Sequence, residues 1–191
     1  MTRFLGVLGA AALVAACATQ PSTVAPVATP IDPAFEAAGR LSARHGSEGV
    51  AVNFTWRHTA LADDFDVATP LGQTVARMRR DTSGVHLQRP NEAVVTYPDW
   101  GTLTASVLGV PIPVNGLVAW IQAAPDGQAA QDIERDNAGR PLVLRQQGWE
   151  IVYAYPDERA TRPMRLVMRY PGSDPIEVRL VVDRWTSLAP S

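Results

Sequence analysis

The chain has 191 residues, an apolar content of 46% and a formal net charge of −2. This length accommodates one domain with appendages, and the apolar content is sufficient for a hydrophobic core. The lack of a basic excess argues against nucleic acid as a partner. A single cysteine, Cys17, excludes an intrachain disulfide and a cysteine-based metal site.

The first sixteen residues have the parts of a secretory signal peptide. Arg3 supplies the positive charge, Phe4 to Val14 is the apolar segment, and small residues follow. The apolar segment is shorter than the roughly 20 residues of a spanning helix. The sequence Leu-Val-Ala-Ala before Cys17 resembles a bacterial lipobox, which predicts cleavage before Cys17 and acylation of this residue. The alternative is an ordinary signal peptide followed by a chance cysteine.

Residues 18–33 are rich in Pro, Thr and Ala and carry almost no charge. Such a segment cannot bury a core, and its prolines favour extended conformations. We interpret it as a tether that reaches about 50 Å when fully extended. Ala18 stands where an Asp would favour retention in the inner membrane, so export to the outer membrane is expected. The predicted organisation is a signal peptide (1–16), a lipidated cysteine with its tether (17–33), and one domain (34–191).

The domain is predicted to be mainly β. Residues 50–56 alternate between apolar and milder side chains, which is typical of a strand with one buried face. Short turns between successive alternating segments predict antiparallel hairpins rather than parallel crossovers. The other alternating segments are 41–43, 65–67, 74–78, 85–87, 93–97, 142–145, 149–153, 164–168 and 176–182.

One turn has an unusual apolar residue at its tip. Pro70 fixes its own φ and Gly72 is free to adopt a positive φ, so Thr69 to Gly72 is predicted to be a turn. Leu71 then lies at the end of a loop, away from the core. An apolar side chain at such a tip is either covered by a neighbour or contacts an apolar partner.

Two short helices interrupt the strands. Asp99 is a candidate cap for a helix through Leu108, and Asn115 for a second helix through Ile121. Residues 109–113 between them are apolar but too rich in Gly and Pro for a regular element. We expect the helices to cover the apolar face of one curled sheet. The concavity is then either filled by its own side chains or open to an apolar guest.

The sequence predicts no catalytic residues and no metal site. The histidines show no HxxxH or HExxH spacing, and we expect them at the surface. Asp63, Asp64 and Asp66 are divided between two faces by the strand period, so they are expected to be a solvated strand start rather than paired catalytic carboxylates. The three histidines are His45, His58 and His86.

Five segments resemble the LolB family of outer-membrane lipoproteins, and they occur in the family's order over roughly Phe35 to Trp185. The resemblance implies an incomplete antiparallel β-barrel with a helical lid over an apolar cavity. It also implies that the cavity accepts the acyl chains of a lipoprotein from the periplasmic carrier LolA and delivers them to the outer membrane. The segments are GRLSAR (39–44), VNFTWRH (52–58), TPLGQT (69–74), LGVPIPVNGLVAWI (108–121) and QQGWEIVY (146–153).

The family's functional residues transfer to four positions. The resemblance implies lipid attachment at Cys17 and a membrane-inserting loop at Pro70, Leu71 and Gly72. No cofactor is expected apart from the covalent N-acyl diacylglycerol on Cys17. The residues lining the cavity are inferred from strand and helix periodicity alone: Phe54, Trp56, Met78, Ile112, Trp120, Met164, Leu166 and Leu180.

The implied partners are a LolA-type periplasmic carrier, acylated lipoprotein cargo and outer-membrane lipid. We expect a monomer, anchored on the periplasmic face of the outer membrane, that is not an enzyme. Transfer would be downhill partitioning, in which about 1.4 kcal/mol changes an equilibrium tenfold. One alternative is a structural or small-lipid-binding lipoprotein with the same fold and no transfer role. A soluble LolA-type carrier is the other, and Cys17 argues against it because a shuttle is not anchored.

Overall fold

The computed structural model describes residues 31–108, 112–127, 130, 132–172 and 175–189. These residues form eleven strands and two helices. The strands are β1 (Phe35–His45), β2 (Glu48–His58), β3 (Asp63–Ala68), β4 (Thr74–Asp81), β5 (Gly84–Gln88), β6 (Val95–Tyr97), β7 (Asp132–Arg135), β8 (Pro141–Gln146), β9 (Trp149–Ala154), β10 (Arg165–Tyr170) and β11 (Ile176–Ser187). The helices are α1 (Trp100–Leu108) and α2 (Val114–Trp120).

All eleven strands belong to one sheet, in the order β6-β5-β4-β3-β2-β1-β11-β10-β9-β8-β7. Every neighbouring pair is antiparallel. The last strand, β11, returns to pair with the first, β1, in the middle of the sheet. The edge strands β6 and β7 are short and lie at opposite ends of the strand order, so the sheet is open. The predicted mainly β, incompletely closed barrel is confirmed.

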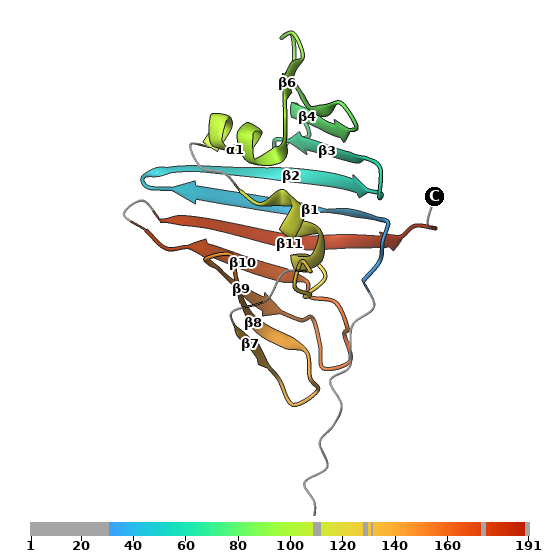
Figure 1. Ribbon diagram of the computed structural model, residues 1–191, viewed down its shortest axis with the longest axis vertical. Coiled ribbons are helices and arrows are strands. Elements are labelled where there is room, and N and C mark those ends of the chain that lie inside the picture. Colours follow the sequence, from blue (N-terminus) through green and yellow to red (C-terminus); the bar gives the residue numbers. More distant parts are fainter. Residues whose placement is uncertain (1–30, 109–111, 128–129, 131, 173–174, 190–191) are drawn as a thin grey trace, which may run out of the picture.

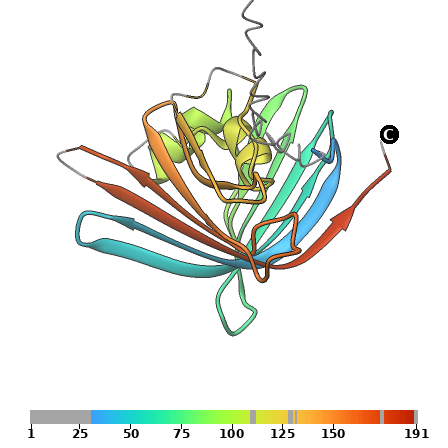
Figure 2. The ribbon, with the colours of Figure 1, turned by 90° about the horizontal axis from the view of Figure 1, so that it is seen from below.

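The helices lie inside the curve of the sheet. Figure 1 shows α1 and α2 crossing in front of the strands, and Figure 2 shows that they occupy the concave side. They follow β6 and precede β7 in the chain. The segment that connects the two edges of the sheet therefore covers its concave face, as a lid would.

The two helices begin differently. The Thr102 backbone N–H donates to the Asp99 carboxylate at 2.7 Å, so the predicted cap of α1 is confirmed. The predicted Asn115 cap of α2 is wrong, because Asn115 lies inside this helix, which starts at Val114 and has no side-chain cap. Pro113 directs the chain into the helix with a φ of −77°, and its carbonyl accepts from Leu117 N–H at 3.2 Å.

Two local features shape the sheet. The predicted hairpin turn between β8 and β9 is confirmed, and both of its central residues, Gln147 and Gly148, have positive φ as a type I′ turn requires. Near the centre of the sheet, β1 has a bulge between Ala38 and Gly39. A Cβ on Gly39 would lie 1.9 Å from the Val181 carbonyl oxygen. Only glycine fits this close approach of β1 to β11, and a bulge of this kind bends its strand.

The core lies between the concave face and the helices. Alternate residues of the strands supply one side of it, as the period of two predicts. The helical segment supplies Trp100, Leu103, Leu117, Trp120 and Ile121. The sheet and its cover therefore form one apolar cluster.

Candidate functional site

The concave face carries continuous rows of apolar side chains that cross the sheet from strand to strand. Residues that face each other in an antiparallel ladder point to the same side, so the strand register defines these rows. One row is Trp185, Ala37, Trp56, Phe65 and Met78. A second row, two same-face positions further along the strands, includes Tyr153, Leu166, Leu180, Leu41 and Val52.

Most of the residues expected to line a cavity lie in this apolar cluster. Met78 and Ile112 are partly buried against it. Met164 is 40% exposed and does not line the covered surface. Met164 precedes β10, at the end of the ladder. Its side chain lies on the same face as that of Leu166, but it is not buried as Leu166 is. The fully or almost fully buried members are Phe54, Trp56, Trp120, Leu166 and Leu180.

At the described residues the centre of the concave face is filled. Trp56, Leu166 and Leu180 have no exposed surface, and Trp120 of α2 is 1% exposed. Of the two states that the sequence left open, the described residues therefore adopt the one in which lid and sheet side chains pack together. An acyl chain could reach these buried side chains only if the helices moved.

The helices are held to the sheet by side chains rather than by strand pairing. The Trp120 indole N–H donates to the Gln146 side-chain oxygen at 2.7 Å, and the Asp126 backbone N–H donates to the same oxygen at 3.1 Å. Gln146 lies on β8 and is completely buried. Tyr97 and Ser106 add a longer hydroxyl contact of 3.4 Å between β6 and α1.

A second attachment joins the end of α2 to the end of the predicted tether, and we call it the Asp32 node. Gln122, two residues after the end of α2, is fully buried and accepts from the Asp32 backbone N–H at 2.7 Å and from Arg162 at 3.1 Å. The Asp32 carboxylate accepts from Arg162 at 2.7 Å, from the Trp185 indole at 2.9 Å and from the Ser187 hydroxyl. The Arg162 guanidinium also lies over the Trp185 ring, 4.6 Å from its centroid.

The charge of the Asp32 node follows from its contacts. Partial burial would raise the pKa of Asp32, but hydrogen bonds from Ser187 and Trp185 and the charge of Arg162 lower it overall. Sequence reasoning missed this node, because its members are 90 to 155 residues apart from Asp32 in the chain. No local spacing brings them together.

A second buried carboxylate, that of Asp63 at the start of β3, lies on the concave side of the sheet. We call this carboxylate and its hydrogen-bond partners the Asp63 node. The Asp63 side chain is 3% exposed. It accepts from the Trp56 indole at 3.0 Å and from Arg80 Nε at 2.5 Å, and His58 Nδ1 lies 2.6 Å away. Burial would raise the pKa of Asp63, but hydrogen bonds from His58, Arg80 and Trp56 lower it overall.

The expectation of a solvated acidic cluster is wrong for Asp63 and holds only for the other two residues. Asp64 and Asp66 face the convex side, where they lie 3.9 Å from Arg79 and 3.7 Å from Arg77. Asp63 shares the parity of the buried Phe65, so the alternation itself contained the signal. His58 was expected at the surface, but its side chain is only 12% exposed.

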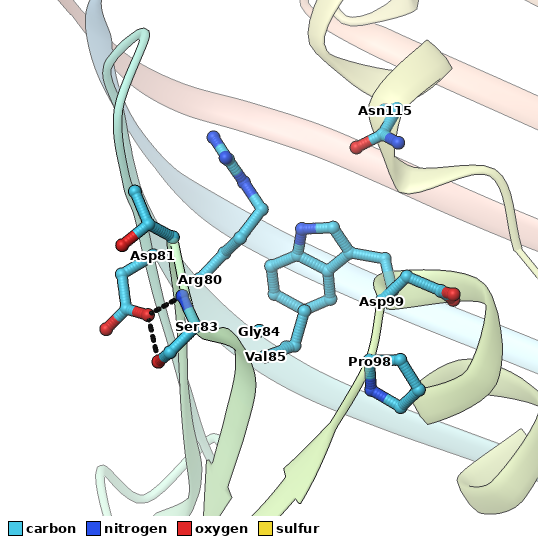
Figure 3. A pocket seen from close by; sticks show the side chains of 10 residues that line it. Arg80, Asp81, Ser83, Gly84, Val85, Pro98, Asp99 and Asn115 are labelled. Atoms are coloured by element: carbon cyan, nitrogen blue, oxygen red, sulfur yellow. Dashed lines mark hydrogen bonds between the residues drawn. The ribbon is translucent and has the colours of Figure 1, made fainter.

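The polar rim of the lid contains two adjoining cavities. One, of about 210 Å³, lies between the β4–β5 turn and the start of α1, and the other, of about 360 Å³, lies between the helices. Figure 3 shows Arg80, Asp81 and Ser83 on one side of the first cavity, with Asp99 and Asn115 on the other. Trp100 lines both cavities, and its buried indole nitrogen has no acceptor among the described residues.

Another buried polar atom lies deeper, on β9. The Tyr153 hydroxyl is buried and has no hydrogen-bond partner within the described part of the chain. Burial in apolar surroundings raises the pKa of Tyr153. The hydroxyl thus stays protonated, and it is a hydrogen-bond donor on the apolar face.

The Leu71 loop has the predicted form. The Gly72 N–H donates to the Thr69 carbonyl at 2.9 Å, which closes a turn with Pro70 and Leu71 at its centre. Gly72 has a φ of +86°, and Thr69 N–H donates to Gln73 O at 2.8 Å. Leu71 is 91% exposed. Figure 2 shows the β3–β4 connection projecting from the convex side, opposite the helices.

Cys17 lies outside the described residues. Within the described ranges no helix has the length and apolar character needed to cross a bilayer. The same part of the chain contains no group of three or more His, Cys, Asp and Glu residues arranged to hold a metal ion.

The fold of one open antiparallel sheet with two covering helices has a counterpart among solved structures. The structure is similar to that of a LolA superfamily protein from Nitrosomonas europaea, with a TM-score of 0.50, 7% sequence identity, and coverage of 84% of this chain and 88% of that chain. At this identity the similarity defines the fold class alone.

The sequence comparisons identify the family. A family model described as outer membrane lipoprotein LolB matches residues 33–185. The chain is 38% identical to the LolB of Thiobacillus denitrificans over 172 residues, which cover 90% of each protein, and 35% identical to that of an Azoarcus species over 191 residues, which cover 97% of each. The chain belongs to the LolB family. It is a lipid-anchored outer-membrane lipoprotein of the LolA/LolB localisation system. The LolB family is not a known family of enzymes.

Proposed function

We propose that the chain is a receptor and insertase for lipoproteins. It accepts the acyl chains of a cargo lipoprotein from a LolA-type periplasmic carrier, holds them between the concave face and the helices, and releases them into the outer membrane. In this proposal Cys17 carries the N-acyl diacylglycerol anchor, and residues 18–33 form the tether to a single domain that begins at residue 34. The protein works as a monomer without a cofactor or catalytic residue.

The observation that supports this proposal most strongly is the way in which the apolar face is covered. The helices pair with no strand among the described residues. The Trp120 indole and the Asp126 backbone N–H donate to Gln146 of β8, and Gln122 accepts from Arg162 in the loop before β10. The cover can therefore move without breaking a ladder. Removal of the cover would expose the apolar rows of the sheet, and acyl chains would replace the helix contacts with contacts of the same kind.

Transfer in this proposal needs no nucleotide. Each acyl CH₂ group gains about 0.8 kcal/mol when it leaves water, so the chains stay bound to an apolar surface throughout. Closure of the lid onto the sheet competes with the cargo for the same surface, which favours release. The Tyr153 hydroxyl and the Trp100 indole could donate hydrogen bonds to the ester and amide carbonyls of the cargo lipid, which are acceptors.

Leu71 is assigned to the release step. It is 91% exposed at the tip of a braced turn, and the β3–β4 connection that carries it projects from the face of the sheet opposite to the lid. Insertion of this side chain would bring the protein against the lipid surface at the moment of delivery. Pro70 and Gly72 hold the leucine at the tip, because they fix the turn on either side of it.

The test is to mix outer membranes containing the full-length lipoprotein with a LolA-type carrier that is loaded with radiolabelled, acylated cargo. The proposal expects the label to move from the carrier to the membrane fraction, and not to move with membranes that lack the protein. Label that stays on the carrier in both cases would contradict the proposal.

The same assay separates the alternative, a structural or small-lipid-binding lipoprotein. The filled interior favours that alternative, because a packed core needs no guest. Such a protein would leave the cargo on the carrier, whether or not it took up free phospholipid from the same mixture.

A further inference from the structure

The convex face has a second feature beside the Leu71 loop, a shallow groove of about 560 Å³ across β10, β11, β1 and β2. Three arginines line it, together with Pro70 of the loop and small or apolar residues. The arginines are Arg40, Arg165 and Arg179, and the apolar floor includes Ala51, Val167 and Val181. The helices on the concave side account neither for the arginines of this groove nor for its position beside the Leu71 loop.

The strand register connects the groove to the loop. Arg165, Val181, Arg40 and Asn53 face one another in a continuous row, which reaches Ala68, directly before the loop. The Asn53 side chain also donates to the Thr69 carbonyl at 3.4 Å, at the base of the turn. Because neighbouring strands are about 4.8 Å apart, Arg165 lies about 15 Å from Asn53 along the sheet.

The groove has more positive than negative charge. Arg40 pairs with Asp183 at 3.1 Å and Arg179 pairs with Glu177 at 2.6 Å, with the arginine side chains more than half exposed. Arg165 is exposed, and it has no acidic partner among the described residues. Its guanidinium therefore presents a planar set of donors, which fits the oxygens of a phosphate.

We propose that this convex groove binds the headgroup phosphates of outer-membrane phospholipids while the Leu71 loop enters the bilayer. The inference rests on the proposed role of the loop and adds the polar half of the membrane contact. Leu71 would lie among the acyl chains and the three arginines at the level of the phosphates. The helices on the concave side would then face the periplasm, where a carrier could reach them.

The test uses the chain from residue 17 onward with Cys17→Ala, which contains every residue that the structure describes and has no lipid anchor. Its binding to vesicles of phosphatidylethanolamine and phosphatidylglycerol is measured by flotation at several salt concentrations. Arg165→Gln is expected to weaken binding about fivefold, the effect of one arginine near an anionic lipid surface. Loss of Arg179 as well should weaken it further and flatten the salt dependence.

Arg159→Gln is the matched control, because the Arg159 side chain is also exposed, has no acidic partner in the described part of the chain and does not line the groove. Arg165→Lys should recover part of the affinity, since it restores the charge but not the planar donor set. Equal binding by the Arg165→Gln and Arg159→Gln proteins would overturn the groove assignment.

Leu71→Glu separates this proposal from the role of the loop. If Leu71→Glu abolishes vesicle binding while Arg165→Gln behaves as Arg159→Gln does, the loop inserts and the groove proposal is wrong. If Arg165→Gln weakens binding and Leu71→Glu does not, the groove contacts lipid and the proposed insertion of the loop is wrong. Weaker binding by both variants is the expected result.

Discussion

Two aspartates in this protein have closely similar partners and different surroundings. Asp63 and Asp32 each accept hydrogen bonds from a tryptophan indole and an arginine. The Asp63 node joins β2, β3 and β4, which are also paired with one another through their backbones. The Asp32 node joins the end of the predicted tether, the end of α2, the loop before β10 and the end of β11.

This difference indicates which part of the molecule is fixed and which can move. The Asp63 node reinforces strands that the ladder already holds, and its carboxylate is 3% exposed. The Asp32 node connects segments that pair with no common strand, and its carboxylate is 18% exposed. We infer that the first node stabilises the sheet, and that the second retains the lid and links it to the tether.

Asp63→Ala is expected to have the largest effect. It leaves the Trp56 indole and the Arg80 guanidinium without their acceptor beneath the sheet, and loss of one partner of a buried ion pair costs about 3 kcal/mol. Urea unfolding should show this loss. The exposed Asp66→Ala, at a site 59% exposed, is the control and should change the unfolding free energy little. Equal losses of unfolding free energy in the two variants would show that the Asp63 node does not stabilise the sheet.

The pH dependence of stability sharpens the same contrast. The folded pKa of Asp63 is lowered from 3.8, so its contribution is fully present above that value and is lost as the pH falls through the lower folded pKa. We expect the unfolding free energy of the native protein to fall steeply below about pH 4. Asp63→Asn should flatten this acid limb, as measured by thermal unfolding between pH 2 and pH 6. An unchanged slope would contradict the assignment.

Asp32→Ala is expected to have a smaller and local effect. Its carboxylate is partly exposed, so loss of the ion pair should cost about 1 kcal/mol and speed amide exchange in residues 114–124 about fivefold. Exchange in β2 and β3 should not change. Asp183→Ala, which removes an exposed partner of Arg40, is the control. Uniformly faster exchange over the whole sheet would show that the Asp32 node is structural rather than a retainer of the lid.

Leu71→Glu should have the smallest effect on stability, within about 0.5 kcal/mol, because the side chain is 91% exposed. Cargo uptake from the carrier should persist, whereas delivery to membranes should fall severalfold. Leu61→Glu changes another leucine that is 69% exposed in a loop, and it should leave delivery intact. Similar delivery by the two variants would remove the Leu71 loop from the mechanism.

The sequence was most informative where neighbouring residues determine the structure. Alternation at positions such as Phe54 and Trp56 predicted the strands and their buried face, and Pro70 with Gly72 predicted the turn that exposes Leu71. Asp99 was recognised as a cap because its partner is three residues away. In each case the determining contact is local.

The parts that sequence reasoning missed depend on distant segments or on strand ends. Asp32, Gln122 and Arg162 meet only after the chain has folded. Met164 follows the alternation of β10 but lies just before its first residue. There the period of two indicates which face a side chain points to, but not whether another element covers it. Asp63 was assigned to solvent because an acidic residue is rarely buried without partners, and its partners come from β2 and β4.

The most direct test of the account is whether cargo acyl chains reach the buried tryptophans. A carrier is loaded with cargo whose acyl chains are brominated, mixed with the protein, and the tryptophan fluorescence is recorded. The account predicts quenching that saturates at one cargo per protein and decreases in Trp56→Phe and Trp120→Phe variants, since both indoles lie between sheet and lid. Delivery of cargo to membranes without any quenching would contradict it.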